Sequence, residues 1–314
     1  MNADSLKRYA ASKKVPVGVA EKDYVLSVAI MQLSKSRYAK KFIFKGGTAI
    51  KKVYYPEARF SADLDFNFFD IPSKELAQDL SRLFNGKKIL EVTFAELEEQ
   101  QIADDKALFR LKYRAQLNHL DNVRLDFSFE EPLLMTPERW TPRDDYDVAR
   151  LMSCEHLAIG VVTIPGYDDR SHSCKIGRMS GQPDRGICLD CKMEAPRRGE
   201  PHPSAFRVMA REEILAEKAR ACLTRARPRD LYDIWFLRSK GVTLDRQMIA
   251  DKLRFYEEFK ATMPNLREIE ERLAPMKDEW DRDLEVLVPA RSYPTFQAAR
   301  DDFLKGLVES GWKP

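Results

Sequence analysis

The chain has 314 residues, enough for one large domain or two ordinary ones, and its 44% hydrophobic and 33% charged residues are typical of a soluble globular protein. The net charge of +3 does not by itself indicate a nucleic-acid partner, and no apolar run approaches the length of a membrane span. Five cysteines, an odd number, argue against a secreted disulfide framework, and the polar first residues lack the apolar core of a signal peptide, so we expect a cytoplasmic protein without membrane contact.

The first part of the chain alternates predicted helices and strands. Helices are predicted over residues 20–36, 48–55 and 73–84, and strands over 41–44, 63–69, 89–97, 108–117 and 123–129. Thr48 is placed to cap the second helix, which Pro56 ends, and Ser73 begins the third. This order predicts an α+β fold in which helices cover one side of a sheet.

The second part of the chain differs in character. Residues 142–204 are rich in Gly, Pro, Asp, Cys and His with little periodicity, which is typical of an insertion. A last strand is predicted over 205–210, and helices follow over 211–226, 229–240, 246–259, 265–287 and 295–308. We therefore predict a sheet domain at 1–141, a Cys- and His-rich insertion at 142–204, and a final strand with a helical domain at 205–314.

Three aspartates occupy predicted strand positions, although aspartate is disfavoured in strands. Residues two apart in a strand share a face, so Asp63 and Asp65 point together away from the core, and Asp126 does the same in its own strand. If the two strands are neighbours, the three carboxylates converge and repel one another unless a cation neutralises them. Mg²⁺ prefers such oxygen ligands and supports in-line attack on phosphorus; a solvent-exposed strand face is the alternative interpretation.

A glycine turn precedes the first two aspartates. Gly46 and Gly47 end one strand where a helix begins near Thr48, and backbone N–H groups at a helix start can approach a phosphate closely when no Cβ intervenes. The Thr48 hydroxyl adds a further donor. Most Gly-Gly turns bind no phosphate. A phosphate site is indicated only by the combination of this turn with an Asp-x-Asp strand and a later strand that carries a third aspartate.

This combination resembles the AbiEii/MenT nucleotidyltransferase toxins, the toxin halves of two-component toxin–antitoxin and abortive-infection systems. The matching segments run in the family's order: EKDYVL (21–26), FKGGTAI (44–50), RFSADLDF (59–66), RLDFSF (124–129), EEILAEKARACLTR (212–225) and RPRDLYDIW (227–235). The resemblance implies a polymerase-beta-type mixed sheet followed by a helical domain. It also implies a metal-dependent enzyme that transfers a nucleotide from an NTP to an acceptor, for some members the 3′ end of tRNA, and a cognate antitoxin.

The resemblance also assigns roles to residues of the site. It implies that Mg²⁺ or Mn²⁺ binds Asp63, Asp65 and Asp126, and that the NTP binds Gly46, Gly47, Thr48, Ser61 and Lys218. In its helical part the family has a lysine and, further along, two aspartates three residues apart. Here these are Lys218, Asp230 and Asp233, and the resemblance implies that they complete the catalytic site. One of the two carboxylates is expected to hold a neighbouring cation, and Asp230 is also placed to cap a helix.

Several arginines lie around this helical half. They are Arg211, Arg220, Arg225, Arg227 and Arg229. Such a cluster can follow an RNA phosphate backbone, but it can equally be a helix surface balanced by nearby glutamates. The sequence leaves both interpretations open.

The predicted insertion carries a candidate zinc site. Cys188 and Cys191 have the spacing of a metal knuckle, Cys174 lies upstream, and His172 or Cys154 would be the fourth ligand. A structural Zn²⁺ ion would explain how a segment with few apolar residues stays folded. A loop with free thiols is the alternative, and the resemblance supports neither.

The sequence thus predicts a nucleotidyltransferase toxin that modifies an acceptor, RNA by expectation, and blocks growth. Two alternatives stay open: a non-catalytic nucleotide- or RNA-binding protein on the same fold, and a nucleotidyltransferase that acts on a small molecule. Clustered carboxylates favour catalysis, because a protein that only binds RNA has no need of concentrated negative charge.

Overall fold

The computed structural model describes residues 2–103, 106–129, 131, 133–140, 176–179, 182–188, 206–256, 263–289 and 292–312. Its α-helices are α1 (Ala3–Lys13), α2 (Val17–Leu33), α3 (Gly46–Ala49), α4 (Ser73–Phe84), α7 (Arg211–Arg225), α8 (Pro228–Ser239), α9 (Arg246–Phe255), α10 (Leu266–Leu273), α11 (Trp280–Leu284) and α12 (Phe296–Glu309). Two 3₁₀ segments, η1 (Ala39–Lys41) and η3 (Ala274–Glu279), and one π-helix, η2 (Ile50–Tyr54), complete the described helical elements.

The strands form one mixed eight-stranded sheet and a separate hairpin. They are β1 (Phe42–Lys45), β2 (Asp63–Phe68), β3 (Lys87–Ile89), β4 (Val92–Ile102), β5 (Lys106–Arg114), β6 (Asp121–Phe129), β7 (Glu138–Trp140), β8 (Ile176–Met179), β9 (Gln182–Cys188) and β10 (Phe206–Val208). The main sheet has the order β3-β4-β5-β6-β2-β1-β10-β7, and β8 pairs with β9. The predicted α+β fold with a mixed sheet is therefore confirmed.

One face of the sheet is an aromatic core. In β2 and β6 the alternate residues Phe66, Phe68, Phe127 and Phe129 are buried, as the sequence pattern predicts. The rings of Phe66 and Phe127 stack with centroids 5.2 Å apart across the parallel β2–β6 pair. Helices α2 and α4 pack against the sheet. The burial of this face fixes the register and sends the intervening polar residues to the opposite face.

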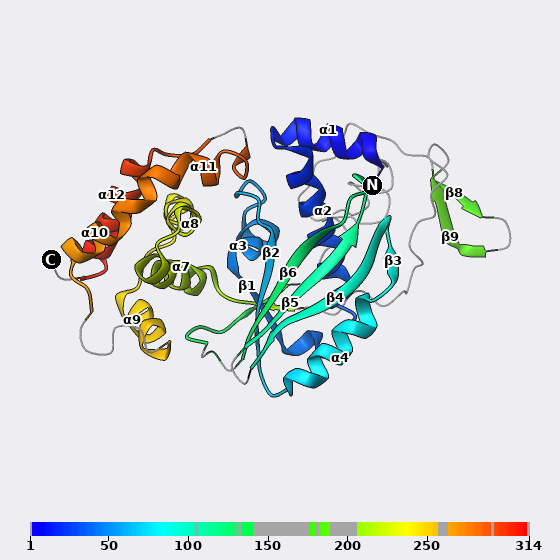
Figure 1. Ribbon diagram of the computed structural model, residues 1–314, viewed down its shortest axis with the longest axis horizontal. Helices are drawn as coiled ribbons and strands as arrows, with labels where there is room; N and C mark the ends of the chain where they lie inside the picture. The colour runs from blue at the N-terminus through cyan, green and yellow to red at the C-terminus, as the bar shows by residue number, and fades with distance from the viewer. Residues whose placement is uncertain are drawn as a thin grey trace.

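Helices α7 to α12 form a second group beside the sheet (Figure 1, left of the view). Strand β10 leads directly into α7 and pairs in parallel with β1, so the first helix of this group starts one strand away from the β7 edge of the sheet. Among the described residues, the helices include none with the length and apolar character needed to cross a membrane.

Most predicted elements occur within a few residues of their expected bounds, and two differences have clear causes. The sequence interpretation assigned no helix before residue 20, yet α1 forms because Leu6 and Ala10 are buried at its contact with α2 and the Asn2 side chain accepts a hydrogen bond from the Ser5 N–H. The single helix predicted over 265–287 is divided into α10, η3 and α11, since Pro275 cannot donate the next helical hydrogen bond.

Candidate active site

The three aspartates predicted as metal ligands lie on neighbouring strands. β2 and β6 pair in parallel, and their register places Asp65 beside Asp126 and Asp63 beside Arg124. The half-buried Asp126 carboxylate forms ion pairs with Lys106 at 3.3 Å and with Arg124 at 3.9 Å. The strands thus bring the carboxylates to one face, while Asp126 is turned toward cations of the chain itself.

The Asp65 carboxyl is buried beside two other negative charges, those of Asp63 and Asp126. Its pKa is raised from the usual 3.8 to about 6, first by burial and then by the charges of Asp63 and Asp126, while Lys218 and Lys45 oppose the rise. In the described part of the chain, no group of three or more His, Cys, Asp or Glu side chains is arranged so that it could hold a metal ion as it stands. The charges of Asp63 and Asp126, which add to the effect of burial on this pKa, would attract a cation placed beside Asp65.

The glycine turn is built around the side chains of the next strand. Gly46 has a φ of +76°, and a Cβ at this position would stand 2.1 Å from Oδ2 of Asp65. A Cβ on Gly47 would lie 2.9 Å from the Arg59 guanidinium and 3.4 Å from the Ser61 hydroxyl. Glycine is therefore required at Gly46 by both backbone conformation and contact, and the predicted nucleotide-binding residues Gly46, Gly47 and Ser61 are close together.

Thr48 has a different local role from the predicted one. The helix begins at Gly46 with Lys45 in the cap position and without a side-chain cap, so the predicted Thr48 cap is wrong. The Thr48 hydroxyl donates instead to the backbone carbonyl of Asp63, and the residue is 1% exposed. Thr48 thereby ties the helix start to the first residue of β2 and holds Asp63 in place.

Replacing Gly46 by alanine is expected to lower activity about 100-fold, because the added methyl group must displace the Asp65 carboxylate by roughly 1 Å. The matched control is Gly86→Ala, which has a φ of +67° but no atom within 4 Å of its Cβ, so it carries the same backbone strain of about 1–2 kcal/mol without the clash. Steady-state rates and thermal denaturation of both variants test this. Equal rates for the two variants would contradict the role of the Gly46–Asp65 contact.

The helical half of the predicted site is held by ion pairs. Lys218 on α7 lies 3.0 Å from Asp230 and 2.9 Å from Asp233, both on α8, and all three residues are at most 9% exposed. The expected pairing of a carboxylate with a neighbouring cation is therefore present for both. Asp230 is not the predicted helix cap: α8 starts at Pro228 after Arg227, and the Asp230 carboxylate bonds to side chains.

Two arginines connect this cluster to the rest of the protein, and the sequence interpretation gave Arg59 no role. Arg59 donates two hydrogen bonds of 2.7 Å to Asp233, a bidentate pair between the loop before β2 and helix α8. Arg225 lies 2.9 Å from Asp230. Against the effect of burial, the charges of Lys218 first and then Arg225 hold the pKa of that carboxyl below its usual range. The only sequence signal for Arg59 was its place in the RFSADLDF segment.

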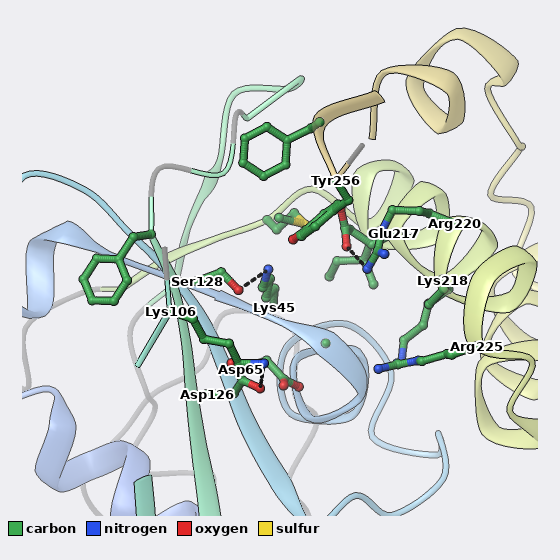
Figure 2. Close-up of a pocket in the computed structure, with 16 residues that line it drawn as sticks. Lys45, Asp65, Lys106, Asp126, Ser128, Glu217, Lys218, Arg220, Arg225 and Tyr256 are labelled. Carbon is green, nitrogen blue, oxygen red and sulfur yellow. Dashed lines mark hydrogen bonds and ion pairs between the residues drawn. The ribbon is translucent and has the colours of Figure 1, made fainter. Parts of the chain in front are cut away.

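A cleft of about 560 Å³ lies between the sheet and α7. Figure 2 shows Asp65 and Asp126 on one side of it and Lys218 and Arg225 on the other. Gly46 also lines the cleft, whereas Asp230 and Asp233 lie behind Lys218 rather than in the wall. We call the strand carboxylates Asp65 and Asp126 the negative wall of the cleft, although Lys45 and Lys106 also line that side, and the α7 cations the positive wall, which Glu217 interrupts.

Three further residues that line the cleft were not predicted from the sequence: Lys45, Glu217 and Tyr256. Arg220, which the sequence placed in the arginine cluster, lines the cleft as well. The Arg220 guanidinium lies 4.1 Å from the ring centroid of Tyr256 and 3.4 Å from Glu217. A signal existed only for Lys45, which directly precedes the Gly-Gly turn; the others depend on the contact of α7 with α9.

The structure describes only some of the residues in the two remaining sequence predictions, the arginine cluster and the zinc site. Of the arginine cluster, Arg211 pairs with Glu212, while Arg220 and Arg225 have the partners given above. Arg227 is exposed and Arg229 half-buried. Of the predicted zinc ligands, Cys188 ends β9, while His172, Cys174, Cys191 and the alternative Cys154 lie outside the described residues.

Comparisons with known proteins identify the family. The family model "Nucleotidyl transferase AbiEii toxin, Type IV TA system" matches residues 29–167 and 182–302. MenT4, a nucleotidyltransferase toxin from Mycobacterium tuberculosis H37Rv, has 18% identity and a TM-score of 0.57, with 97% of this chain and 90% of that chain covered. JHP933 from Helicobacter pylori has 14% identity and a TM-score of 0.44, with 95% and 96% covered. No curated protein matches the sequence significantly.

The family match covers most of the chain, including the strands with the aspartates and the helices with Lys218 and Asp233. The likeness to MenT4 shows the same fold. Such a family implies an NTP substrate and an antitoxin partner. The chain belongs to the AbiEii family of nucleotidyltransferase toxins of type IV toxin–antitoxin systems, and it is a nucleotidyltransferase.

Proposed function

We propose that this enzyme transfers a nucleotide from an NTP to the 3′ end of tRNA in the cytoplasm, with Mg²⁺ or Mn²⁺, and that the modification blocks growth until the antitoxin intervenes. The observation that carries the proposal is the cleft, in which Asp65 and Asp126 face Lys218 and Arg225. A negative wall suits a divalent cation, and a positive wall suits a triphosphate, which are the two charged components of nucleotidyl transfer.

The residues of the negative wall fit a hard divalent cation. Asp65 and Asp126 of this wall supply oxygen donors on one sheet face, and Asp63 lies on the same face outside the cleft lining. Burial first, and then the charges of Asp63 and Asp126, raise the pKa of Asp65, and positive charge relieves that repulsion. Asp126 would exchange its ion pair with Lys106 for the metal. When bound, the ion supplies charge that activates an attacking hydroxyl and neutralises phosphate oxygens.

The other walls of the cleft fit the nucleotide. Lys218 is kept in position by Asp230 and Asp233, so its ammonium can meet the triphosphate without a large loss of side-chain freedom. Phe255 at the end of α9 lines the cleft, and it is 40% exposed. An exposed ring beside charged groups suits a nucleobase, which stacks on aromatic faces.

The sheet face beside the negative wall suits an RNA acceptor. Lys106, Arg110 and Arg124 stand on this face next to Asp126, and their side chains are 38%, 45% and 49% exposed. They form ion pairs with carboxylates of the same face, which phosphate groups of RNA would replace. An acceptor held along this face would bring its end to Asp126 and Asp65.

The direct test incubates the protein with each of the four labelled NTPs, Mg²⁺ and total tRNA. Label is expected to enter tRNA from at least one NTP, and Asp126→Asn is expected to reduce the rate about 1,000-fold through loss of a metal ligand. Asp301→Asn on α12 is the control, since this carboxylate is exposed and, in the part of the chain that the structure describes, its polar partners are Gln297 and Arg300.

Growth on expression provides the second readout. The wild type is expected to arrest growth and Asp126→Asn to permit it. Label that enters small molecules but never RNA would overturn the acceptor assignment, and equal rates for Asp126→Asn and Asp301→Asn would overturn the role of the carboxylates. Transfer that persists in the presence of excess chelator would overturn the metal dependence.

A further inference from the structure

A chain of buried ion pairs starts at the cleft and ends in the helical group. Lys45 at the end of β1 forms an ion pair with Glu131, which follows β6. Glu131 also lies 2.9 Å from Lys252 on α9, and Lys252 lies 2.8 Å from Glu213 and 3.2 Å from Glu217 on α7. Glu131, Glu213 and Lys252 are 0% exposed. None of these residues has a part in the roles assigned above.

Burying such a chain of ion pairs carries a large desolvation penalty. Each charge loses its hydration, which pairing offsets only with good geometry, and apolar residues of similar size often stabilise a protein equally well. Glu213 is further fixed by the backbone N–H groups of Leu134 and Met135, at 3.0 and 2.9 Å. Two members of the cluster, Lys45 and Glu217, line the cleft, and Lys45 is the cation of the two, held from behind by the buried Glu131.

Lys45 occupies a central place in the cleft. It directly precedes Gly46, and the β1–β2 register makes it the Cα partner of Asp65. Its side chain is 11% exposed, and Figure 2 shows its ammonium in the middle of the cleft, near Ser128 at 3.4 Å. Lys218 lies on the opposite side, so a group entering the cleft meets a cation from each side.

We infer that Lys45 is a further catalytic residue, whose ammonium binds phosphate oxygens of the NTP, and that Glu131, held by Lys252, is its positioning residue. This inference rests on the proposed function. In the transfer, an acceptor oxygen bonds to the α-phosphorus, its proton passes to water, and pyrophosphate leaves with the electron pair of the broken bond. Lys45 offsets part of the negative charge that the pyrophosphate gains.

The test is a double-mutant cycle in kcat/KM for NTP, with Lys45→Met, Glu131→Gln and the double variant. Lys45→Met is expected to lower kcat/KM about 100-fold, as for removal of one charge-stabilising donor. Glu131→Gln is expected to lower it about 10-fold, because Lys45 loses its fixed position. The double variant should resemble Lys45→Met alone, since Glu131 acts through Lys45. Additive losses of about 1,000-fold would overturn the positioning role.

Two further variants separate this role from folding. Lys45→Arg keeps the positive charge and is expected to recover activity to within about tenfold of the wild type. Lys51→Met replaces another buried lysine, which donates to the Pro56 and Ala58 carbonyls outside the cleft, and kcat/KM of its folded fraction should be unchanged. Thermal denaturation is measured for every variant.

The outcomes distinguish the inference from the proposed function. If the wild type transfers label and Lys45→Met does so within threefold of the same kcat/KM, the inference is wrong and the proposed function stands. If Lys45→Arg folds but is as inactive as Lys45→Met, the charge of Lys45 is not what the reaction uses, and the inference is wrong. If the wild type transfers no label, both the proposed function and the inference about Lys45 are wrong.

Discussion

Replacing Asp65 by asparagine is expected to stabilise the protein at pH 7 while removing its transfer activity. The carboxyl has a pKa of about 6 in the folded protein against 3.8 as its usual value, because burial and the charges of Asp63 and Asp126 oppose its ionisation. Keeping it ionised at neutral pH therefore costs folding free energy. Asparagine removes that cost, about 3 kcal/mol, and with it a ligand for the proposed cation.

The sign of the pH dependence follows from the same values. A carboxyl whose pKa is raised on folding stabilises the folded state below about pH 4, and this contribution is lost as the pH rises through about 6. The wild type and Asp65→Asn should thus be equally stable near pH 4. Above pH 6 the variant should be the more stable of the two, by a constant amount.

Thermal denaturation of both proteins between pH 4 and pH 8 measures this difference, and each wild-type measurement is repeated with Mg²⁺. Mg²⁺ should raise the melting temperature of the wild type, since it relieves the repulsion at Asp65, and should have little effect on Asp65→Asn. Asp301→Asn serves as the control with an exposed carboxylate. A variant less stable than the wild type at pH 7 would contradict the electrostatic cost at Asp65.

The strand half of the site was largely predictable because its signal is local. Period-two alternation places Asp63 and Asp65 on one face opposite buried phenylalanines, and the same rule applies to Asp126. Only the pairing of β2 with β6 had to be assumed. Thr48 was misassigned because the helix begins two residues earlier, at Gly46, whose positive φ lets the chain turn from β1 into the helix at once.

The residues of the helical half of the site were predicted from the family resemblance and not from any periodicity or spacing in the sequence. Nothing in the local sequence distinguishes Lys218 from a solvated helix lysine. Its buried position in the site depends on ion pairs with Asp230 and Asp233, which lie on another helix. The cluster of Lys45, Glu131 and Lys252 was missed for the same reason. Its members are up to 207 positions apart (Lys45 to Lys252), and only tertiary packing pairs their charges.

Replacing Asp233 by alanine is expected to have the largest effect on stability. Asp233 is 2% exposed and accepts two hydrogen bonds from Arg59, itself 4% exposed, and it also pairs with Lys218. Alanine leaves the Arg59 charge buried without its carboxylate partner, which costs about 3–5 kcal/mol. Because Arg59 precedes β2 and Asp233 lies on α8, the loss falls on the contact between the sheet and the helical group.

Chemical denaturation of Asp233→Ala measures this cost against a surface pair as control. Glu75→Ala removes the partner of Arg37 in a pair whose side chains are both 51% exposed, and it should change the unfolding free energy by less than about 1 kcal/mol. A cost for Asp233→Ala no larger than that of Glu75→Ala would show that the Arg59–Asp233 pair does not hold the two parts together.

A double variant, Arg59→Met with Asp233→Leu, separates stability from catalysis. It removes both buried charges, so much of the lost stability should return, as it does when buried ion pairs are replaced by apolar residues of similar size. Activity should stay low, at about the level of Asp233→Ala, because Lys218 still lacks one of the two carboxylates that position it. Recovery of stability together with activity would mean that Asp230 alone positions Lys218, and that Asp233 serves only the fold.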